Sequence, residues 1–190
     1  MRKIASALKS LDLPEKSKIA ILSKNCAEWF LADLAIMMSG HISIPIYPTL
    51  EANTINTILE HSESKANIVG KLDNYEAQKS GIPDIHKIGI EAYGIAEDLS
   101  WEELVERHEP MLDIPDENED DIMTIMYTSG TTGVPKGVML SHNNLVSNVT
   151  DTVVGLPFLK DIHKVLSFLP VCHVFERMLH YLYIYSGITI

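Results

Sequence analysis

The sequence predicts an α/β fold in which mostly parallel sheets are flanked by helices. Short β-rich runs alternate with amphipathic segments along the 190 residues, an order typical of parallel sheets whose faces are covered by helices. An apolar content of 46% supplies a sizeable core. A loop rich in hydroxyl residues and glycines follows one predicted strand, where open α/β sheets place their ligands.

Residues 1–111 form the first predicted subdomain portion, because strands and helices alternate in it. The predicted strands are residues 18–23, 43–48, 66–70 and 86–90, and helices are predicted within residues 1–16, 27–40, 50–64 and 100–110. The last of these helices begins at Ser100, with Glu103 at the capping-box position.

Residues 112–121 ("LDIPDENEDD") are predicted to form an acidic, solvated linker. They carry six carboxylates, one proline and few apolar side chains. A metal site is the alternative interpretation, but the segment lacks the glycine and the terminal glutamate of a calcium loop.

Residues 122–190 form the second predicted subdomain portion. Strands are predicted at 121–130 and 164–170, and helices at 141–156 and 173–187. Leu145, Val149, Val153 and Leu156 form one stripe of the first helix. Residues 188–190 begin a strand on which the chain stops, so we expect a truncated chain.

The charge and the cysteines exclude several classes of protein. A formal net charge of −11 disfavours nonspecific binding to nucleic acids and to anionic lipid surfaces. Cys26 and Cys172 lie far apart without metal-site spacing and are interpreted as reduced thiols of a cytoplasmic protein. No signal peptide or membrane-spanning segment is predicted.

The loop "YTSGTTGVPKGVMLSH" (127–142) has the composition of a polyphosphate site. Gly130, Gly133 and Gly137 would let backbone N–H groups approach an anion. Thr128, Ser129, Thr131 and Thr132 add hydroxyl donors, and Lys136 adds a positive charge. The P-loop of the large NTPase class does not fit, because Lys136 follows proline and precedes glycine. A surface turn is the alternative that composition alone leaves open.

The order of these residues resembles the signature loop of the AMP-forming acyl-CoA synthetase, or adenylate-forming, superfamily. "LSFLPVCHVFERM" (166–178) is similar to the next motif of the long-chain fatty-acid–CoA ligases, and the region around "AEWFLADLAIMMSGHISIPIYPTL" is similar to the N-terminal sheet region of that branch. The resemblance covers nearly the whole chain and is weakest over residues 71–110. It implies part of the large N-terminal domain of such a synthetase.

The resemblance implies an activity, a set of substrates and a set of site residues. Family members attack ATP with a carboxylate, release pyrophosphate and transfer the acyl group from acyl-AMP to coenzyme A. By position, Thr128, Ser129, Gly130, Thr131, Thr132, Gly133 and Lys136 would hold the phosphates, with Thr128 and Thr131 near Mg²⁺. Lys136 and His173 are the expected catalytic residues, with His173 lining the acyl and adenylate pocket.

Several polar residues near these motifs also have a purely structural interpretation. Without the family, His173 would be a helix cap or a core residue. Glu176 and Arg177 are expected in an ion pair rather than in catalysis, and His142 beside the cap Ser141 is expected to be mainly structural.

The family's later motifs are not in the sequence: the Tyr-Gly-x-Thr-Glu segment with its metal-binding glutamate, the ribose-holding aspartate, the hinge and the C-terminal lysine. The chain is therefore expected to be an internal piece of a synthetase that does not turn over alone. Peripheral membrane contact and a homodimer stay open. The alternatives are an aryl-CoA ligase, an acyl-AMP ligase, a peptide-synthetase adenylation domain and a noncatalytic nucleotide-binding module.

Overall fold

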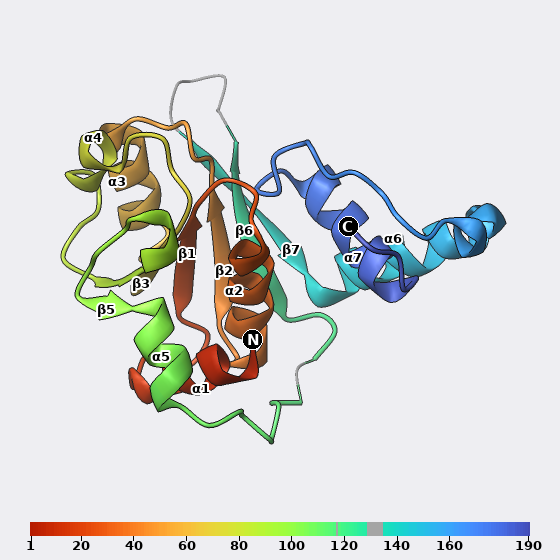
Figure 1. Cartoon of the computed structure of the whole chain (residues 1–190), viewed down its shortest axis with the longest axis horizontal. Helices are drawn as coiled ribbons and strands as arrows, with labels where there is room; N and C mark the ends of the chain where they lie inside the picture. The colour runs from red at the N-terminus through yellow and green to blue at the C-terminus, as the bar shows by residue number, and fades with distance from the viewer. Residues whose placement is uncertain (117, 129–134) are drawn as a thin grey trace.

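The computed structural model describes residues 1–116, 118–128 and 135–190 (Figure 1). Among them, seven strands form one sheet in the order β5-β4-β3-β1-β2-β6-β7. The strands are β1 (Lys18–Leu22), β2 (Ile42–Ile46), β3 (Ala66–Val69), β4 (His86–Gly89), β5 (Leu99–Ser100), β6 (Ile122–Thr128) and β7 (Lys136–Ser141). All neighbouring strands are parallel except β6 and β7, which are antiparallel. The predicted α/β class with a mostly parallel sheet is confirmed.

Helices cover both faces of this sheet. The α-helices are α1 (Arg2–Ser10), α2 (Ala27–Met38), α3 (Ala52–His61), α4 (Tyr75–Lys79), α5 (Trp101–Arg107), α6 (His142–Gly155) and α7 (Val174–Tyr185), and the 3-10 helices are η1 (Glu91–Tyr93) and η2 (Pro157–Asp161). Side chains of α1, α2 and α5 share one core cluster with Ile19 and Ile21 of β1. Side chains of α3 and α4 share another with Ala20 and Leu22, because successive residues of a strand point to opposite faces.

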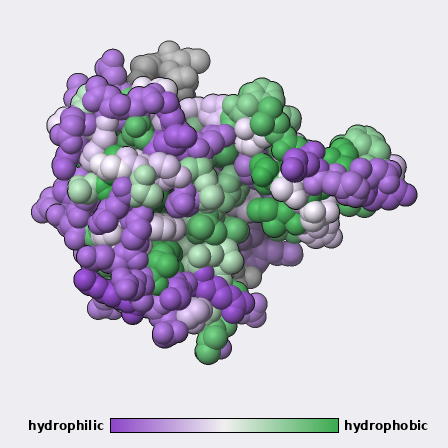
Figure 2. Space-filling model, viewed as in Figure 1, coloured by the Kyte–Doolittle hydropathy of each residue, from purple (hydrophilic) through white to green (hydrophobic). Residues whose placement is uncertain are grey.

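The helices α6 and α7 lie beyond β7, which is one edge of the sheet, whereas α4 lies toward the opposite edge (Figure 1). They enclose a small cluster of their own, formed by Val149, Leu159, Leu182 and Ile188. Apolar side chains also gather on the surface of this unit (Figure 2), where Val154, Leu166 and Phe168 are 83%, 82% and 76% exposed.

Two helix caps follow the predicted sequence signals. The Ser100 hydroxyl accepts a hydrogen bond from the Glu103 N–H at the start of α5, although the Glu103 carboxylate pairs with Arg107 instead. Ser141 caps α6 in a complete capping box with Asn144. Leu145 and Val149 are buried as predicted, whereas Leu156 is 37% exposed because α6 ends at Gly155.

The predicted strand over residues 164–170 is wrong. Lys164 forms an isolated parallel bridge with Thr189, and the alternating Leu166 and Phe168 point to solvent instead of entering a sheet. The segment is held by side chains: Asn25 Nδ2 donates to the Leu169 carbonyl at 2.7 Å, and Asn25 Oδ1 accepts from the Val171 N–H at 3.1 Å.

The acidic segment has no helix or strand in residues 112–116 and 118–121. The Asp121 carboxylate pairs with Lys16 at 2.7 Å. Strand β6 then joins the sheet of the first portion by pairing with β2. The division into residues 1–111, 112–121 and 122–190 stays a prediction.

Candidate functional site

The predicted phosphate loop connects two antiparallel strands. The sequence predicts that the loop runs from a strand into a helix, but β7 lies between them, and Thr128 at the end of β6 faces Lys136 at the start of β7. The sequence does not indicate a strand at "KGVML", because the glycine and proline before it favour a turn. Ser129, Gly130, Thr131, Thr132 and Gly133 lie outside the described residues.

Thr128 and Lys136 present their side chains to the same face of the hairpin, because residues directly opposite each other in an antiparallel pair do so. Both side chains are exposed. Neither side chain forms a hydrogen bond or ion pair with another residue that the structure describes. The hairpin therefore ends in an available hydroxyl and an available ammonium group.

Gly137 is required by packing within the hairpin. It pairs with Tyr127, and a Cβ at this position would come within 2.8 Å of Ile125 Cγ2 and 3.4 Å of the Tyr127 ring. Gly137 belongs to a strand, and its missing side chain makes room for Ile125 and Tyr127. The expectation that its backbone approaches an anion stays a prediction.

Ligand pockets in proteins commonly measure about 300–1,000 Å³, and the cavity beside this hairpin measures ≈ 750 Å³. Its lining is mostly apolar and comes from the turn after β2, from α3, from both hairpin strands and from the turn before α7. The lining residues are Tyr47, Thr49, Leu50, Thr54, Ile58, Met126, Tyr127, Thr128, Pro135, Val138, Leu140, Cys172, His173 and Val174. The cavity therefore brings Thr128 and His173 together, whereas Lys136 is not part of its wall.

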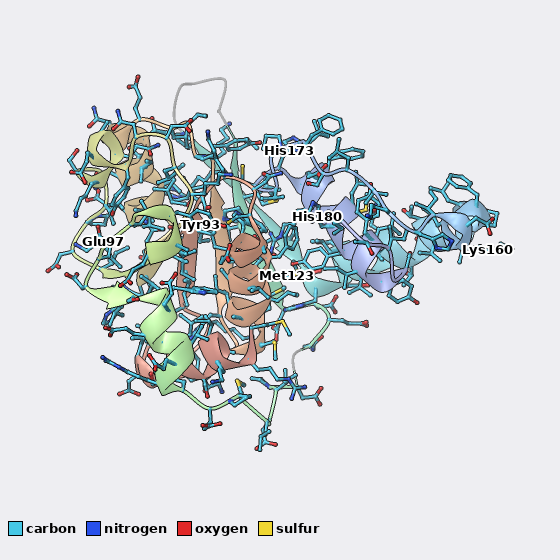
Figure 3. The ribbon with its side chains drawn as sticks, viewed as in Figure 1. Tyr93, Glu97, Met123, Lys160, His173 and His180 are labelled. Carbon is cyan, nitrogen blue, oxygen red and sulfur yellow. The ribbon has the colours of Figure 1, made fainter. Side chains whose placement is uncertain are left out.

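His173 is the N-cap of α7, and its Nδ1 accepts a hydrogen bond from the Phe175 N–H at 3.3 Å. Because Nδ1 acts as an acceptor, the neutral imidazole carries its proton on Nε2. The structure thus gives His173 both the cap role and the place at the cavity. In Figure 3, His173 lies at the start of α7 and Lys160 lies at the opposite end of the α6–α7 unit.

Two other cavity residues are held in neutral forms. The Tyr127 hydroxyl and His61 Nδ1 form a 2.7 Å hydrogen bond, and burial raises the pKa of Tyr127. Burial also raises the pKa of the Cys172 thiol to about 12, so this thiol is not a nucleophile near neutral pH. Both cysteines are free, as predicted.

Residues 1–190 match the family described as AMP-binding enzyme. The chain belongs to this family. Long chain acyl-CoA synthetase 4 from Arabidopsis thaliana is 30% identical to it over 210 residues, which cover 99% of this chain and 31% of that protein. The chain thus spans about a third of the length of this relative.

Solved structures share the fold of this AMP-binding chain. The N-terminal domain of FACL13 from Mycobacterium tuberculosis, solved with an inhibitor, superposes with a TM-score of 0.82 and 25% identity, covering 99% of this chain and 46% of that one. O-succinylbenzoate CoA synthetase from Bacillus subtilis, solved with ATP and a magnesium ion, gives a TM-score of 0.76 and 21% identity, covering 99% and 47%.

The AMP-binding chain also contains a buried ion pair in which the sequence predicted Arg177 but not its partner. Arg177 of α7 and Asp33 of α2 are fully buried. Arg177 Nε and Nη2 donate to the Asp33 carboxylate at 2.9 and 2.7 Å. An ion pair was expected for Arg177 and Glu176, but the partner is Asp33, far away in sequence, and no local pattern indicates it.

Buried Glu176 and His180 form a second cluster with the half-buried Ser167 in this family member. The Ser167 hydroxyl donates to Glu176 Oε1 at 2.6 Å, and His180 Nε2 lies 2.7 Å from the same hydroxyl oxygen. His180 stacks on Phe30 with 4.1 Å between ring centroids. Since the carboxylate accepts the serine proton and does not contact His180 Nδ1, the cluster is not arranged as a nucleophilic triad.

The described residues of the AMP-binding chain contain no group of three or more His, Cys, Asp or Glu side chains that could hold a metal ion. Of the two predicted metal contacts, Thr128 is described and Thr131 is not. No described helix is both long and apolar enough to cross a membrane.

Proposed function

We propose that the chain is the phosphate-binding portion of a long-chain fatty-acid–CoA ligase. The whole enzyme would use ATP to convert a fatty acid to acyl-AMP and pyrophosphate, and would then form acyl-CoA. The observation that carries the proposal is the exposed Thr128–Lys136 pair, at the end of a hairpin whose neighbouring residues line an apolar cavity with His173. Membership of the AMP-binding enzyme family and the Arabidopsis relative support the reaction class.

In the adenylation step, a carboxylate oxygen attacks the α-phosphorus while the bond to the bridging oxygen breaks and pyrophosphate leaves. Two anions must approach each other, so the enzyme needs fixed donors around the β- and γ-phosphates. Lys136 would neutralise charge that develops on the departing pyrophosphate. Thr128 would donate its hydroxyl to the phosphates, and Ser129, Gly130, Thr131, Thr132 and Gly133 of the loop would complete the cradle.

His173 would orient the substrate acid. Its Nδ1 is engaged by the cap of α7, so Nε2–H is the group left to donate a hydrogen bond to the carboxylate. The apolar side chains of the cavity, among them Ile58, Met126 and Val138, would contact the hydrocarbon part of the acid and exclude water from the reacting carboxylate.

ATP would enter with Mg²⁺, which binds phosphate oxygens and few protein ligands. Thr128 fits such a role because its hydroxyl is exposed and makes no hydrogen bond to another described residue, and Thr131 is the second candidate. The Bacillus subtilis synthetase of the same fold was solved with ATP and magnesium. Coenzyme A would be the acyl acceptor, because its thiol displaces AMP from acyl-AMP.

The chain spans less than half of the solved enzymes that share its fold. We therefore propose that other parts of a longer enzyme complete the adenine, ribose and magnesium contacts, and that these 190 residues do not turn over alone. A cytoplasmic location, peripheral membrane contact and a homodimer stay predictions.

Binding of MgATP to this chain tests the phosphate role. Wild type, Lys136→Ala and Lys160→Ala would be compared by isothermal titration with MgATP. Lys160 is a matched control, because it is an exposed lysine at the far end of the molecule (Figure 3). We expect Lys136→Ala to weaken binding about tenfold and Lys160→Ala to leave it unchanged. Equal affinity in all three proteins would exclude the assigned role of Lys136.

A further inference from the structure

We propose that Arg177 is a positioning residue that fixes the imidazole of His173 relative to Thr128 across the cavity. This inference rests on the proposed function, in which these two side chains contact the acid and the phosphates. Arg177 itself is fully buried and does not line the cavity. It would act through α7 and β6.

The guanidinium group of Arg177 is held at three points. Nε and Nη2 bind both oxygens of Asp33, and Nη1 donates to Thr124 Oγ1 at 2.8 Å. The planar fork allows one orientation of the side chain that makes all three hydrogen bonds. Arg177 therefore ties α7 to α2 and to β6 at the same time.

The oxygens of Asp33 are also fully used. Oδ1 accepts a further hydrogen bond from the Ser43 hydroxyl at 2.7 Å, and Oδ2 accepts one from the Tyr181 hydroxyl. The Thr124 hydroxyl in turn donates to the Ser43 carbonyl at 2.7 Å. The carboxylate is thereby fixed between α2, β2 and α7. The position of the guanidinium group is therefore fixed relative to a rigid part of the sheet.

The link from Arg177 to His173 is one helical turn. The Arg177 N–H donates to the His173 carbonyl at 3.1 Å, and the His173 ring caps the same turn through Phe175. A shift or rotation of Arg177 would therefore move the N-cap and its ring.

The link from Arg177 to the phosphate loop is strand β6. Thr124 and Thr128 are four residues apart on this strand, and their side chains share one face because strands alternate with a period of two. The hydrogen bond between Arg177 and Thr124 thus fixes the start of α7 relative to the strand that carries Thr128.

Stability alone does not account for this arrangement. A buried ion pair gains little over well-packed apolar side chains of similar volume, because both charges lose their hydration. Directional bonds to two separate elements, in contrast, determine how α7 lies against β6, and apolar contacts would not do so with the same geometry.

The tautomer of the His173 ring gives a direct test on this chain. Nitrogen-15 NMR of the side chain distinguishes a protonated from an unprotonated ring nitrogen, and the His173→Asn variant, which keeps a capping side chain, identifies the signals. In wild type we expect Nδ1 unprotonated and Nε2 protonated. In Thr124→Val and Arg177→Lys, we expect this single-tautomer pattern to be lost as the cap loosens.

Tyr181→Phe is the matched control, because it removes one hydrogen bond to Asp33 but leaves the Arg177 fork intact. It should keep the wild-type pattern. Thermal unfolding verifies that each variant is folded, and Thr124→Val keeps the test decisive if Arg177→Lys does not fold. Wild-type tautomer patterns in folded Thr124→Val would overturn the proposal.

A second readout separates this inference from the proposed function. In the longest gene product that carries these residues, Thr124→Val should raise KM for the fatty acid about tenfold and leave KM for ATP unchanged. Absence of fatty-acid-dependent activity in wild type would contradict the proposed function and would leave the tautomer result to decide on positioning. Equal KM values for the acid in an active variant would count against Arg177 positioning His173.

Discussion

Single residues decide how the last helix is attached to the sheet. Asp33 and Arg177 lie 144 positions apart in sequence, and each looks unremarkable in its own helix. Desolvation lowers the pKa of Arg177, but Asp33 and Tyr181 together outweigh this effect and leave the pKa raised, so the guanidinium stays charged. Sequence reasoning predicted an ion pair for Arg177 and not its partner, because the pairing depends on how α2 and α7 meet.

Removing one member of this pair should be strongly destabilising. Asp33→Ala leaves the Arg177 guanidinium buried without its partner, which costs about 3–5 kcal/mol of unfolding free energy. Urea denaturation followed by circular dichroism measures the change. The control is Asp73→Ala, which removes the partner of Lys24 in an exposed ion pair and should cost less than about 1 kcal/mol. Similar losses for both variants would contradict the role of burial.

Replacing two glycines by alanine should change the stability of the fold in opposite directions. In Gly137→Ala the new methyl group would meet Ile125 at 2.8 Å, so we expect a loss of about 1–3 kcal/mol. Gly155 ends α6 and has nothing within 4 Å of the position of a Cβ, so Gly155→Ala should be neutral or stabilise by up to about 1 kcal/mol. Thermal unfolding of both variants checks the signs, and a stable Gly137→Ala would refute the close approach in the hairpin.

At the scale of elements, local signals predicted what is locally determined. The capping serines, the apolar stripe of α6 and the β-α-β alternation of the first portion all depend on neighbours within a few residues. The predictions for β7 and for residues 164–170 were wrong because the structure of both segments depends on distant partners. Strand β7 forms by pairing with β6. Residues 167–171 are held by hydrogen bonds with Asn25 and Glu176.

The cap of α6 provides a prediction for an element. Ser141 accepts a hydrogen bond from the Asn144 N–H, and Ser141→Ala leaves that donor without its cap, at a cost of about 0.5–2 kcal/mol. Ser147→Ala is the control, because Ser147 is exposed in the middle of the same helix and alanine is the better helix former. Hydrogen exchange of the first-turn amides should accelerate in Ser141→Ala, and unchanged exchange would contradict the cap.

At the scale of the whole molecule, the sequence predicted the fold class and the region of the site, but not its composition. Thr128 and His173 were identified from motifs, and the structure places both at one cavity. Tyr47, Thr54 and Ile58 of the same cavity could not be identified, since they lie far from the motifs in sequence and resemble ordinary apolar or turn residues.

The acidic composition has a consequence for stability at low pH. Burial raises the pKa of Glu97, but hydrogen bonds from Tyr75 and Lys79, together with the positive charges of Lys79 and Lys87, outweigh it and hold the pKa below the ordinary value of 4.5. Because the folded-state pKa is depressed, the stabilisation is present above pH 4.5 and is lost as the pH falls through the folded-state value. The unfolding free energy should therefore decline below that pH. In Glu97→Gln the decline should be shallower, and an identical slope would exclude this contribution.

We propose that this hairpin holds the phosphates of ATP while a fatty acid is activated. Fatty-acid-dependent exchange between ATP and pyrophosphate, measured over a panel of acid lengths in the longest gene product that carries these residues, tests it most directly. We expect exchange with long-chain acids, a loss of most of it in Lys136→Ala, and wild-type exchange in Lys160→Ala. Exchange that is absent with every acid, or that is equal in wild type and Lys136→Ala, would contradict the claim.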